Sequence, residues 1–208
     1  MLLIVDEVIC GFFRTGNTWG TQTYGIEPDM LACAKALSAS YIPISALMIN
    51  DKVWQGILTE SDKIGTFGHG YTYSGHPVAA AVAIETQKLY KERDMLSHVR
   101  RQMGPFQKKL GALVEEDLVG EVRGVGLVAG LELVKNKQTR EAFAPIGKVG
   151  RLVAGRAQDN GLIVRAIGDT IAVCPPLIID EAQVDELVAR IKKSLREAAV
   201  QAKKDGMI

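Results

Sequence analysis

The chain opens on a continuous apolar run, Leu2-Leu-Ile-Val5, that ends in two carboxylates, Asp6 and Glu7. A strand with one face in water alternates apolar and polar residues, whereas a strand covered on both faces is apolar throughout. The run therefore predicts a central strand of a parallel sheet, and hence an α/β fold. Such a strand needs a neighbour on each side, so we expect the chain to be part of something longer.

Short apolar runs and helical segments continue this pattern as far as the middle of the chain. We expect strands at residues 30–33 and 44–49 and a helix over residues 52–63. Pro77 predicts the start of a long helix, because proline is well tolerated in a first helical turn. Between these helices lies a polar loop rich in glycine and hydroxyl residues, which makes it a candidate for function.

The second half has a different composition, and we place a domain boundary between residues 80 and 100. A helical pattern resumes at about Pro105, and residues 121–134 predict two strands joined by a glycine turn. Later segments predict a helix over residues 146–158, paired strands at 161–164 and 170–173, and an amphipathic helix over residues 181–203.

Composition excludes several classes of partner. The 208 residues carry 25 basic and 24 acidic side chains, so we expect neither nucleic acid nor an anionic membrane as a partner. Cys10, Cys33 and Cys174 are widely spaced in apolar surroundings, which argues against a disulfide framework or a metal site. They fit a reducing cytoplasm. No apolar run has the length of a membrane span, and no signal peptide is visible.

Lys35 is the first candidate for chemistry. It ends an apolar run and precedes small and hydroxyl residues. A neutral amine attacks aldehydes and forms a Schiff base, and a nearby carboxylate can hold a protonated ring nitrogen. Lys35 and Asp6 therefore supply the two protein groups that a pyridoxal phosphate enzyme needs. Lys35 is otherwise a surface lysine, and Asp6 otherwise caps a loop or pairs with an arginine.

Four further residues have both a functional and an ordinary explanation. Val8 can pack against a flat ring or belong to the core. Tyr71 and Thr72 lie in a glycine loop that suits a phosphate, although a plain loop has the same composition. Arg165, expected at the end of a strand, can grip a substrate carboxylate, be solvated or pair with Asp169.

Taken together, these residues resemble the class III aminotransferases, which are fold-type I pyridoxal phosphate enzymes. The resemblance lies in residues 2–16, 24–29, 34–38, 70–77, 122–127 and 174–177, in family order. It is greatest to the ω-amino acid:pyruvate branch. The resemblance implies a partial α/β large domain of fold type I, which binds pyridoxal 5'-phosphate, over residues 1–90. A small C-terminal α+β domain follows over residues 91–208.

The resemblance also implies a role for each candidate. Lys35 would form the Schiff base with the cofactor and act as general acid and base. Asp6 would hold the pyridinium nitrogen, and Val8 would pack against the ring. Tyr71 and Thr72 would reach the cofactor phosphate of the neighbouring subunit, so a homodimer with a shared active site is expected.

Arg165 matches the arginine that binds the substrate carboxylate. The expected reaction moves an amino group from an ω-amino acid or primary amine to pyruvate or another 2-oxo acid. Two alternatives stay open. One is an aminomutase or decarboxylase built on the same scaffold. The other is a non-catalytic or split-gene fragment that needs a partner chain.

The sequence departs from the family pattern in three places. Phe13 stands where the family more often has glycine, which predicts a repacked loop. Ile9 stands where several branches have a glutamine, which favours the ω-amino acid branch. The N-terminal half of the family is absent, and with it part of the phosphate site and one wall of the ring pocket. We therefore expect the isolated chain to be inactive or to bind the cofactor weakly.

Overall fold

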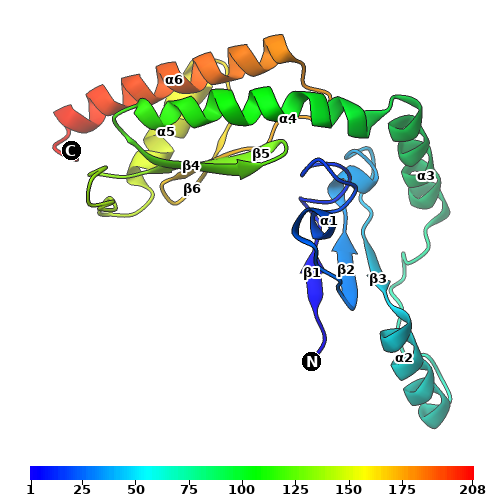
Figure 1. The fold of residues 1–208 in the computed structure, drawn as a ribbon. Helices are drawn as coiled ribbons and strands as arrows, with labels where there is room; N and C mark the ends of the chain where they lie inside the picture. The colour runs from blue at the N-terminus through cyan, green and yellow to red at the C-terminus, as the bar shows by residue number, and fades with distance from the viewer. The chain divides into compact units, whose positions relative to one another are not determined.

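The computed structural model describes residues 1–208, which form two compact units, Met1–Ser97 and His98–Ile208 (Figure 1). The elements of the first unit are β1 (Ile4–Asp6), α1 (Gly20–Tyr24), β2 (Met30–Cys33), the 3-10 turn η1 (Lys35–Leu37), β3 (Ala46–Ile49), α2 (Asp51–Ile64) and α3 (Pro77–Glu92). The expected strands and the two expected helices are present, and α1 was not expected. The first unit is therefore α/β.

The first unit is built on a three-stranded sheet of order β1-β2-β3. β1 and β2 are parallel, whereas β2 and β3 are antiparallel. The prediction that the first strand is covered on both sides is wrong for this chain. Leu3 and Ile4 are 47% and 60% exposed, because β1 is an edge strand that pairs only with β2.

The two long helices of this unit begin where local chemistry places them. The Asn50 side chain accepts a hydrogen bond from the Val53 N–H at 3.0 Å and so caps α2. Helix α3 begins at Pro77, as predicted, and His76 Nδ1 accepts from the Ala79 N–H at 3.4 Å. His76 therefore has the hydrogen-bonding role that suits a loop histidine before a helix.

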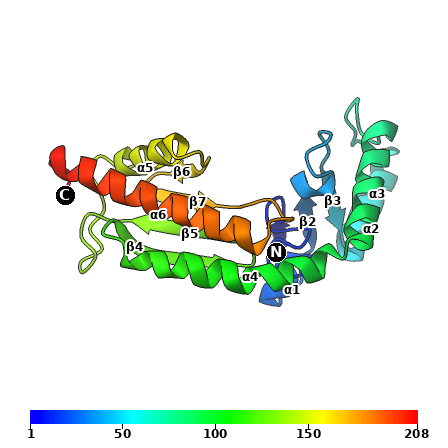
Figure 2. The ribbon, with the colours of Figure 1, turned by 90° about the horizontal axis from the view of Figure 1, so that it is seen from above.

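The second unit contains one antiparallel sheet of order β4-β5-β7-β6. Its elements are most of α4 (Met95–Gly111), which begins three residues before the unit does, and then η2 (Ala112–Glu115), β4 (Val119–Val125), β5 (Val128–Leu133), α5 (Lys148–Asp159), β6 (Arg165–Ile167), β7 (Thr170–Val173) and α6 (Glu181–Lys204). The long helices α4 and α6 lie along one face of the sheet (Figure 2). This part of the chain is α+β.

Alternation along β5 explains which face of this sheet is covered. Ala129, Leu131 and Leu133 are buried, whereas Glu132 points outward and pairs with Arg123 of the neighbouring strand. A period of two is the pattern of an antiparallel sheet with one face toward the core. The core of the second unit therefore lies between the sheet and its helices.

Helix α4 begins earlier than predicted. The sequence indicated a start near Pro105, but the helix runs from Met95 and contains Pro105 in its interior. Proline costs a backbone hydrogen bond there. Val99, Phe106 and Leu110 on the same helix are fully buried, so their packing offsets that loss.

The hairpin near residue 168 also differs from the prediction. We expected a strand over residues 161–164, but β6 is Arg165–Ile167. Its register pairs Arg165 with Ala172 and Ile167 with Thr170. Only Gly168 and Asp169 remain for the turn, and Gly168 has a φ of 59°. A two-residue hairpin turn requires such left-handed backbone, so the glycine determines which residues pair.

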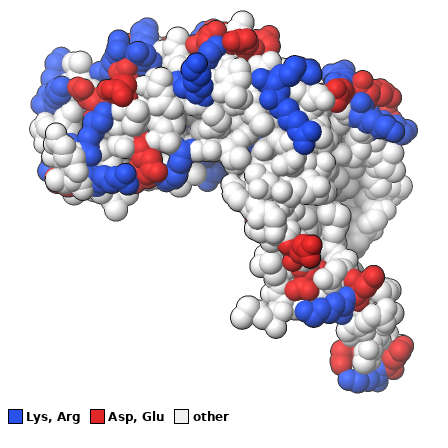
Figure 3. Space-filling view, in the orientation of Figure 1, with Lys and Arg blue, Asp and Glu red and all other residues white.

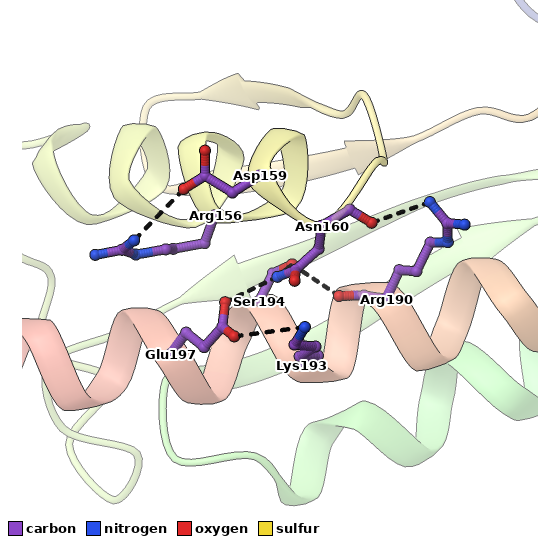
Figure 4. A network of polar contacts seen from close by, with 7 residues as sticks. All are labelled: Arg156, Asp159, Asn160, Arg190, Lys193, Ser194 and Glu197. Carbon is purple, nitrogen blue, oxygen red and sulfur yellow. Dashed lines mark hydrogen bonds and ion pairs between the residues drawn. The ribbon is translucent and has the colours of Figure 1, made fainter.

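A polar network joins the end of α5 to α6 (Figure 4). Arg190 donates to the backbone carbonyls of Asn160 and Gly161 at 3.0 and 2.6 Å. The Asn160 side chain donates to Ser194 Oγ and Glu197 Oε2 at 3.2 and 2.8 Å. Carbonyls that the helix end leaves without partners are thereby satisfied by a charged donor.

On the face shown in Figure 3, basic and acidic side chains are interspersed over the second unit, and α2 carries both signs. The three cysteines form no disulfide. None of the helices combines the length and apolar character needed to cross a bilayer.

Candidate active site

Asp6 and Lys35 lie at the carboxyl ends of two neighbouring parallel strands. Asp6 is the last residue of β1 and stands opposite Ala32 of β2, and Lys35 follows β2 by two residues. The Glu7 N–H donates to the Ala32 carbonyl at 2.8 Å, which continues the pairing beyond β1. Ligands of open α/β sheets bind beyond the carboxyl ends of the strands. The Lys35 amine and the Asp6 carboxylate both belong to residues at that end of the sheet.

The backbone of Lys35 is in an uncommon conformation. Its φ is 47°, in the left-handed region that few residues other than glycine adopt. Such strain costs about 1–3 kcal/mol and gathers at functional sites. Lys35 opens η1, and its side chain is exposed. The apolar run that precedes Lys35 therefore does not bury its side chain in this chain.

Asp6 is exposed, and one of its oxygens is occupied. Oδ1 accepts a hydrogen bond from the Val8 N–H at 2.9 Å. This is the loop-capping role that the sequence left open as an alternative. A carboxylate has about four acceptor positions, so this bond leaves room for a further donor. Val8, which is half-buried, is held beside the carboxylate by the same bond.

Glu7 has a structural role that sequence reasoning missed. Its side chain is 1% exposed and accepts from the Gly20 and Thr21 N–H groups at 2.9 and 2.6 Å. These are the first N–H groups of α1, where a carboxylate is favourable. The sequence pattern did not predict α1, so it offered no signal for this interaction.

Tyr71 and Thr72 lie in an exposed turn of the loop between α2 and α3. The Tyr71 N–H donates to Ser74 Oγ at 3.1 Å, and the Ser74 N–H donates back to the Tyr71 carbonyl at 2.9 Å. These bonds close the turn on itself and leave the Thr72 hydroxyl exposed. The His69 and Tyr71 rings meet edge to face, with ring centroids 5.6 Å apart.

Arg165 is exposed and is the first residue of β6, so the expectation that it ends a strand is wrong. The alternative in which it pairs with Asp169 is also not observed. Asp169 accepts from the Gly147 and Gly150 N–H groups at 2.6 and 2.7 Å, at the start of α5. A carboxylate whose oxygens accept hydrogen bonds from a helix N-terminus does not need an arginine as a partner.

The groups at the β1–β2 edge match the chemistry of pyridoxal 5'-phosphate. Its aldehyde is held by a lysine amine, and its ring nitrogen by a carboxylate. Lys35 and Asp6 are a lysine and a carboxylate, both exposed and both at the carboxyl ends of the paired strands β1 and β2. The residues therefore fit the cofactor.

Comparison with known proteins agrees with this chemistry. The family model described as "Aminotransferase class-III" matches residues 1–195. The chain belongs to the class-III aminotransferases. Pyridoxal phosphate is the cofactor of this family.

Two curated class-III relatives show how far the similarity extends. A putrescine–pyruvate aminotransferase of Pseudomonas aeruginosa is 48% identical over 200 residues, which are 96% of this chain and 43% of that protein. A chloroplastic gamma aminobutyrate transaminase 3 of Solanum lycopersicum is 43% identical over 197 residues, 95% of this chain and 38% of that protein. The chain spans less than half the length of either relative.

Solved structures give the same picture. The omega transaminase of Pseudomonas jessenii in complex with PMP superposes with a TM-score of 0.94 at 44% identity. The match covers 98% of this chain and 45% of that one. The predicted family and the predicted partial α/β transaminase fold are therefore confirmed.

Proposed function

We propose that this chain is the C-terminal part of an aminotransferase that moves an amino group from an ω-amino acid or primary amine to pyruvate or another 2-oxo acid. The observation that carries the proposal is the delivery of Lys35 and Asp6 to one edge of the sheet. Putrescine and gamma aminobutyrate, named in the relatives, each end in a primary amine, which suits this donor class.

In this proposal each residue holds one part of the cofactor. Lys35 Nζ would bond the aldehyde carbon and carry a proton. Asp6 would accept a hydrogen bond from the N–H of the ring, and Val8 would pack against the ring face. Bound pyridoxal phosphate supplies an electron sink for amino transfer. Residues 1–90 would form the C-terminal part of the cofactor domain, and residues 91–208 the small domain.

The remaining residues act on the phosphate and the substrate. Thr72 and Tyr71 would contact the cofactor phosphate of a second subunit, which requires a homodimer. Their exposure in a glycine loop supports this role. Arg165, exposed at the start of β6, would bind the carboxylate of the amino acid or 2-oxo acid in bidentate fashion. Three cysteines without a disulfide support a cytoplasmic location.

The first experiment tests the cofactor lysine. The 208-residue chain is incubated with pyridoxal phosphate, reduced with borohydride and digested for mass spectrometry. We expect the pyridoxyl group on Lys35 and its loss in Lys35→Ala. Lys52→Ala is the matched control, because Lys52 is exposed and pairs only with Asp29 at 3.4 Å. Equal labelling of many lysines, unchanged in Lys35→Ala, would contradict the proposal.

The second experiment tests the reaction. Residues 1–208 replace the matching segment of the putrescine–pyruvate relative, and alanine formation from pyruvate is measured with putrescine and with gamma aminobutyrate. We expect transfer that Lys35→Ala abolishes, while the unfused chain shows little or none. Decarboxylation or amine migration without transfer would point to the alternative reactions. Full turnover by the unfused chain would contradict the expected incompleteness.

One observation also favours a second candidate, a chain that acts only with a partner polypeptide. Leu2, Leu3 and Ile4 are exposed at the start of β1, which is an edge strand, and edge strands can recruit other strands. Co-expression with the N-terminal segment of a relative tests it. We expect a soluble complex from both pieces and poor solubility of the chain alone. A chain that is soluble and monomeric by itself, and that does not bind the segment, would contradict this role.

A further inference from the structure

The turn that carries Lys35 is held by two side chains from α3. Tyr90 Oη donates to the Ala36 carbonyl at 2.8 Å, and Gln87 Nε2 donates to the Leu37 carbonyl at 3.0 Å. Residues three apart lie on the same face of a helix, so both donors approach η1 together. The two carbonyls directly after Lys35 thus accept from residues that lie 54 and 50 positions further along the chain.

This turn needs such support because its backbone is strained. Lys35, Ala39 and Ser40 have φ values of 47°, 48° and 65°. The left-handed conformation costs conformational energy in residues with a Cβ, so they adopt it only where the surrounding structure holds them. Within the turn, Ser38 Oγ donates to the Ile42 carbonyl at 2.7 Å. Ala36 and Leu37 pack on the cluster of Phe12, Leu31 and Cys33, and the donors from α3 add hydrogen bonds to the turn from outside it.

The ring of Tyr90 is itself held by packing contacts. Its ring meets the Phe13 ring edge to face, with centroids 5.7 Å apart, and packs on the cluster of Phe12, Leu31 and Cys33. Burial raises the pKa of the Tyr90 hydroxyl, and the charge of Arg14 opposes that shift. The hydroxyl therefore stays protonated at neutral pH and can donate to Ala36.

We propose that Tyr90 is a positioning residue for Lys35, with Gln87 as its second anchor. The proposal rests on the proposed function, in which Lys35 bonds the cofactor. Tyr90 touches neither cofactor nor substrate in this account. Its hydroxyl holds the Ala36 carbonyl, and the strained turn then presents the Lys35 amine at the carboxyl edge of β1 and β2.

Tyr90→Phe isolates the hydroxyl because the ring and its contact with Phe13 are kept. We expect amide hydrogen exchange in residues 34–42 to accelerate about fivefold, the factor for one neutral hydrogen bond. Exchange in β2 and α3 stays as in the unmodified chain. At saturating pyridoxal phosphate, the fraction of Lys35 trapped by borohydride falls, while the cofactor concentration for half-trapping does not change.

Two variants complete the test. Tyr24→Phe removes the hydroxyl of an exposed tyrosine and is expected to change neither readout. Gln87→Leu is expected to accelerate amide hydrogen exchange in the same residues, 34–42, as Tyr90→Phe does. Unchanged exchange and trapping in Tyr90→Phe would overturn the inference. The exchange readout needs no cofactor, so failure of Lys35 labelling in the unmodified chain would count against the proposed function alone.

Discussion

Residues with left-handed backbone lie in both loops that follow the strands of the candidate site. Phe13 has a φ of 76°, and Lys35 has a φ of 47°. Phe13 therefore keeps the conformation that glycine adopts easily and carries the strain of a Cβ. Its ring contact with Tyr90 and the hydrogen bond from the Gly16 N–H to its carbonyl at 2.8 Å help to offset this strain.

Two substitutions at Phe13 separate strain from packing. Alanine removes the ring but keeps the Cβ, whereas glycine removes both. We expect Phe13→Gly to be more stable than Phe13→Ala by about 1 kcal/mol in free energy of unfolding, because only alanine stays strained. Urea denaturation of both variants measures the difference.

The same pair of substitutions at an unstrained position is the control for Phe13. Gln55 lies on the exposed part of α2, so alanine there is expected to be the more stable replacement. An alanine variant at Phe13 that is as stable as the glycine variant would show that the backbone is not strained.

Helices and strands of the second unit are linked by one buried carboxylate. Glu116, just before β4, accepts from Arg196 Nε and Nη2 of α6 at 2.8 and 3.1 Å and lies 3.4 Å from Lys192. Hydrogen bonds from Arg196 lower the pKa of Glu116 below its usual 4.5, against the effect of burial. The ionised form is therefore the one that the fold stabilises.

This linkage predicts how stability depends on pH. A carboxylate with a lowered pKa in the folded state stabilises above its unfolded value, here 4.5, and loses that contribution as the pH falls through the folded value. We expect the free energy of unfolding to decline below pH 4.5, and to decline less in Glu116→Gln. Urea titrations between pH 7 and pH 3 measure both slopes.

Asp117 offers the matched control for Glu116. It pairs with Lys203 at 3.1 Å, but both side chains are more than 60% exposed, so the pair contributes little. Asp117→Asn should therefore leave the pH dependence close to that of the unmodified chain. Equal slopes for Glu116→Gln and the unmodified chain would contradict the assignment.

The two units of the chain differ in how much core they contain. The largest fully buried side chains include Phe106, Leu131 and Ile191 of the second unit, whereas Glu7 is the one member from the first. Apolar burial contributes about 25 cal/mol per Å², so the second unit has the larger source of stability. The first unit instead exposes apolar side chains along β1 and α2.

A fragment of residues 95–208 is therefore expected to fold alone. It keeps α4 whole together with the sheet of the second unit. We expect a cooperative thermal transition and slow tryptic digestion, whereas residues 1–94 should be digested first in the full chain. Mass spectrometry of timed digests measures this order. A fragment that melts without cooperativity, or early cleavage inside residues 95–208, would contradict it.

Much of the architecture follows from local chemistry. Pro77 starts α3, the Gly126 turn joins β4 to β5, and the amphipathic pattern of α6 holds from Glu181 almost to its end. The missed features depend on register or packing. Helix α1 is formed around the Glu7 carboxylate, and Arg165 begins β6 because the hairpin turn leaves only two residues unpaired.

The sequence by itself determined the family, the strand ends that carry Asp6 and Lys35, and the cofactor that such a pair suits. These properties reside in residue type and spacing along the chain. Only the tertiary structure decided that Lys35 is exposed and strained and that Tyr90 holds its turn across 54 positions. The physical reason is that such contacts arise where distant surfaces meet, and no local periodicity encodes which surfaces these are.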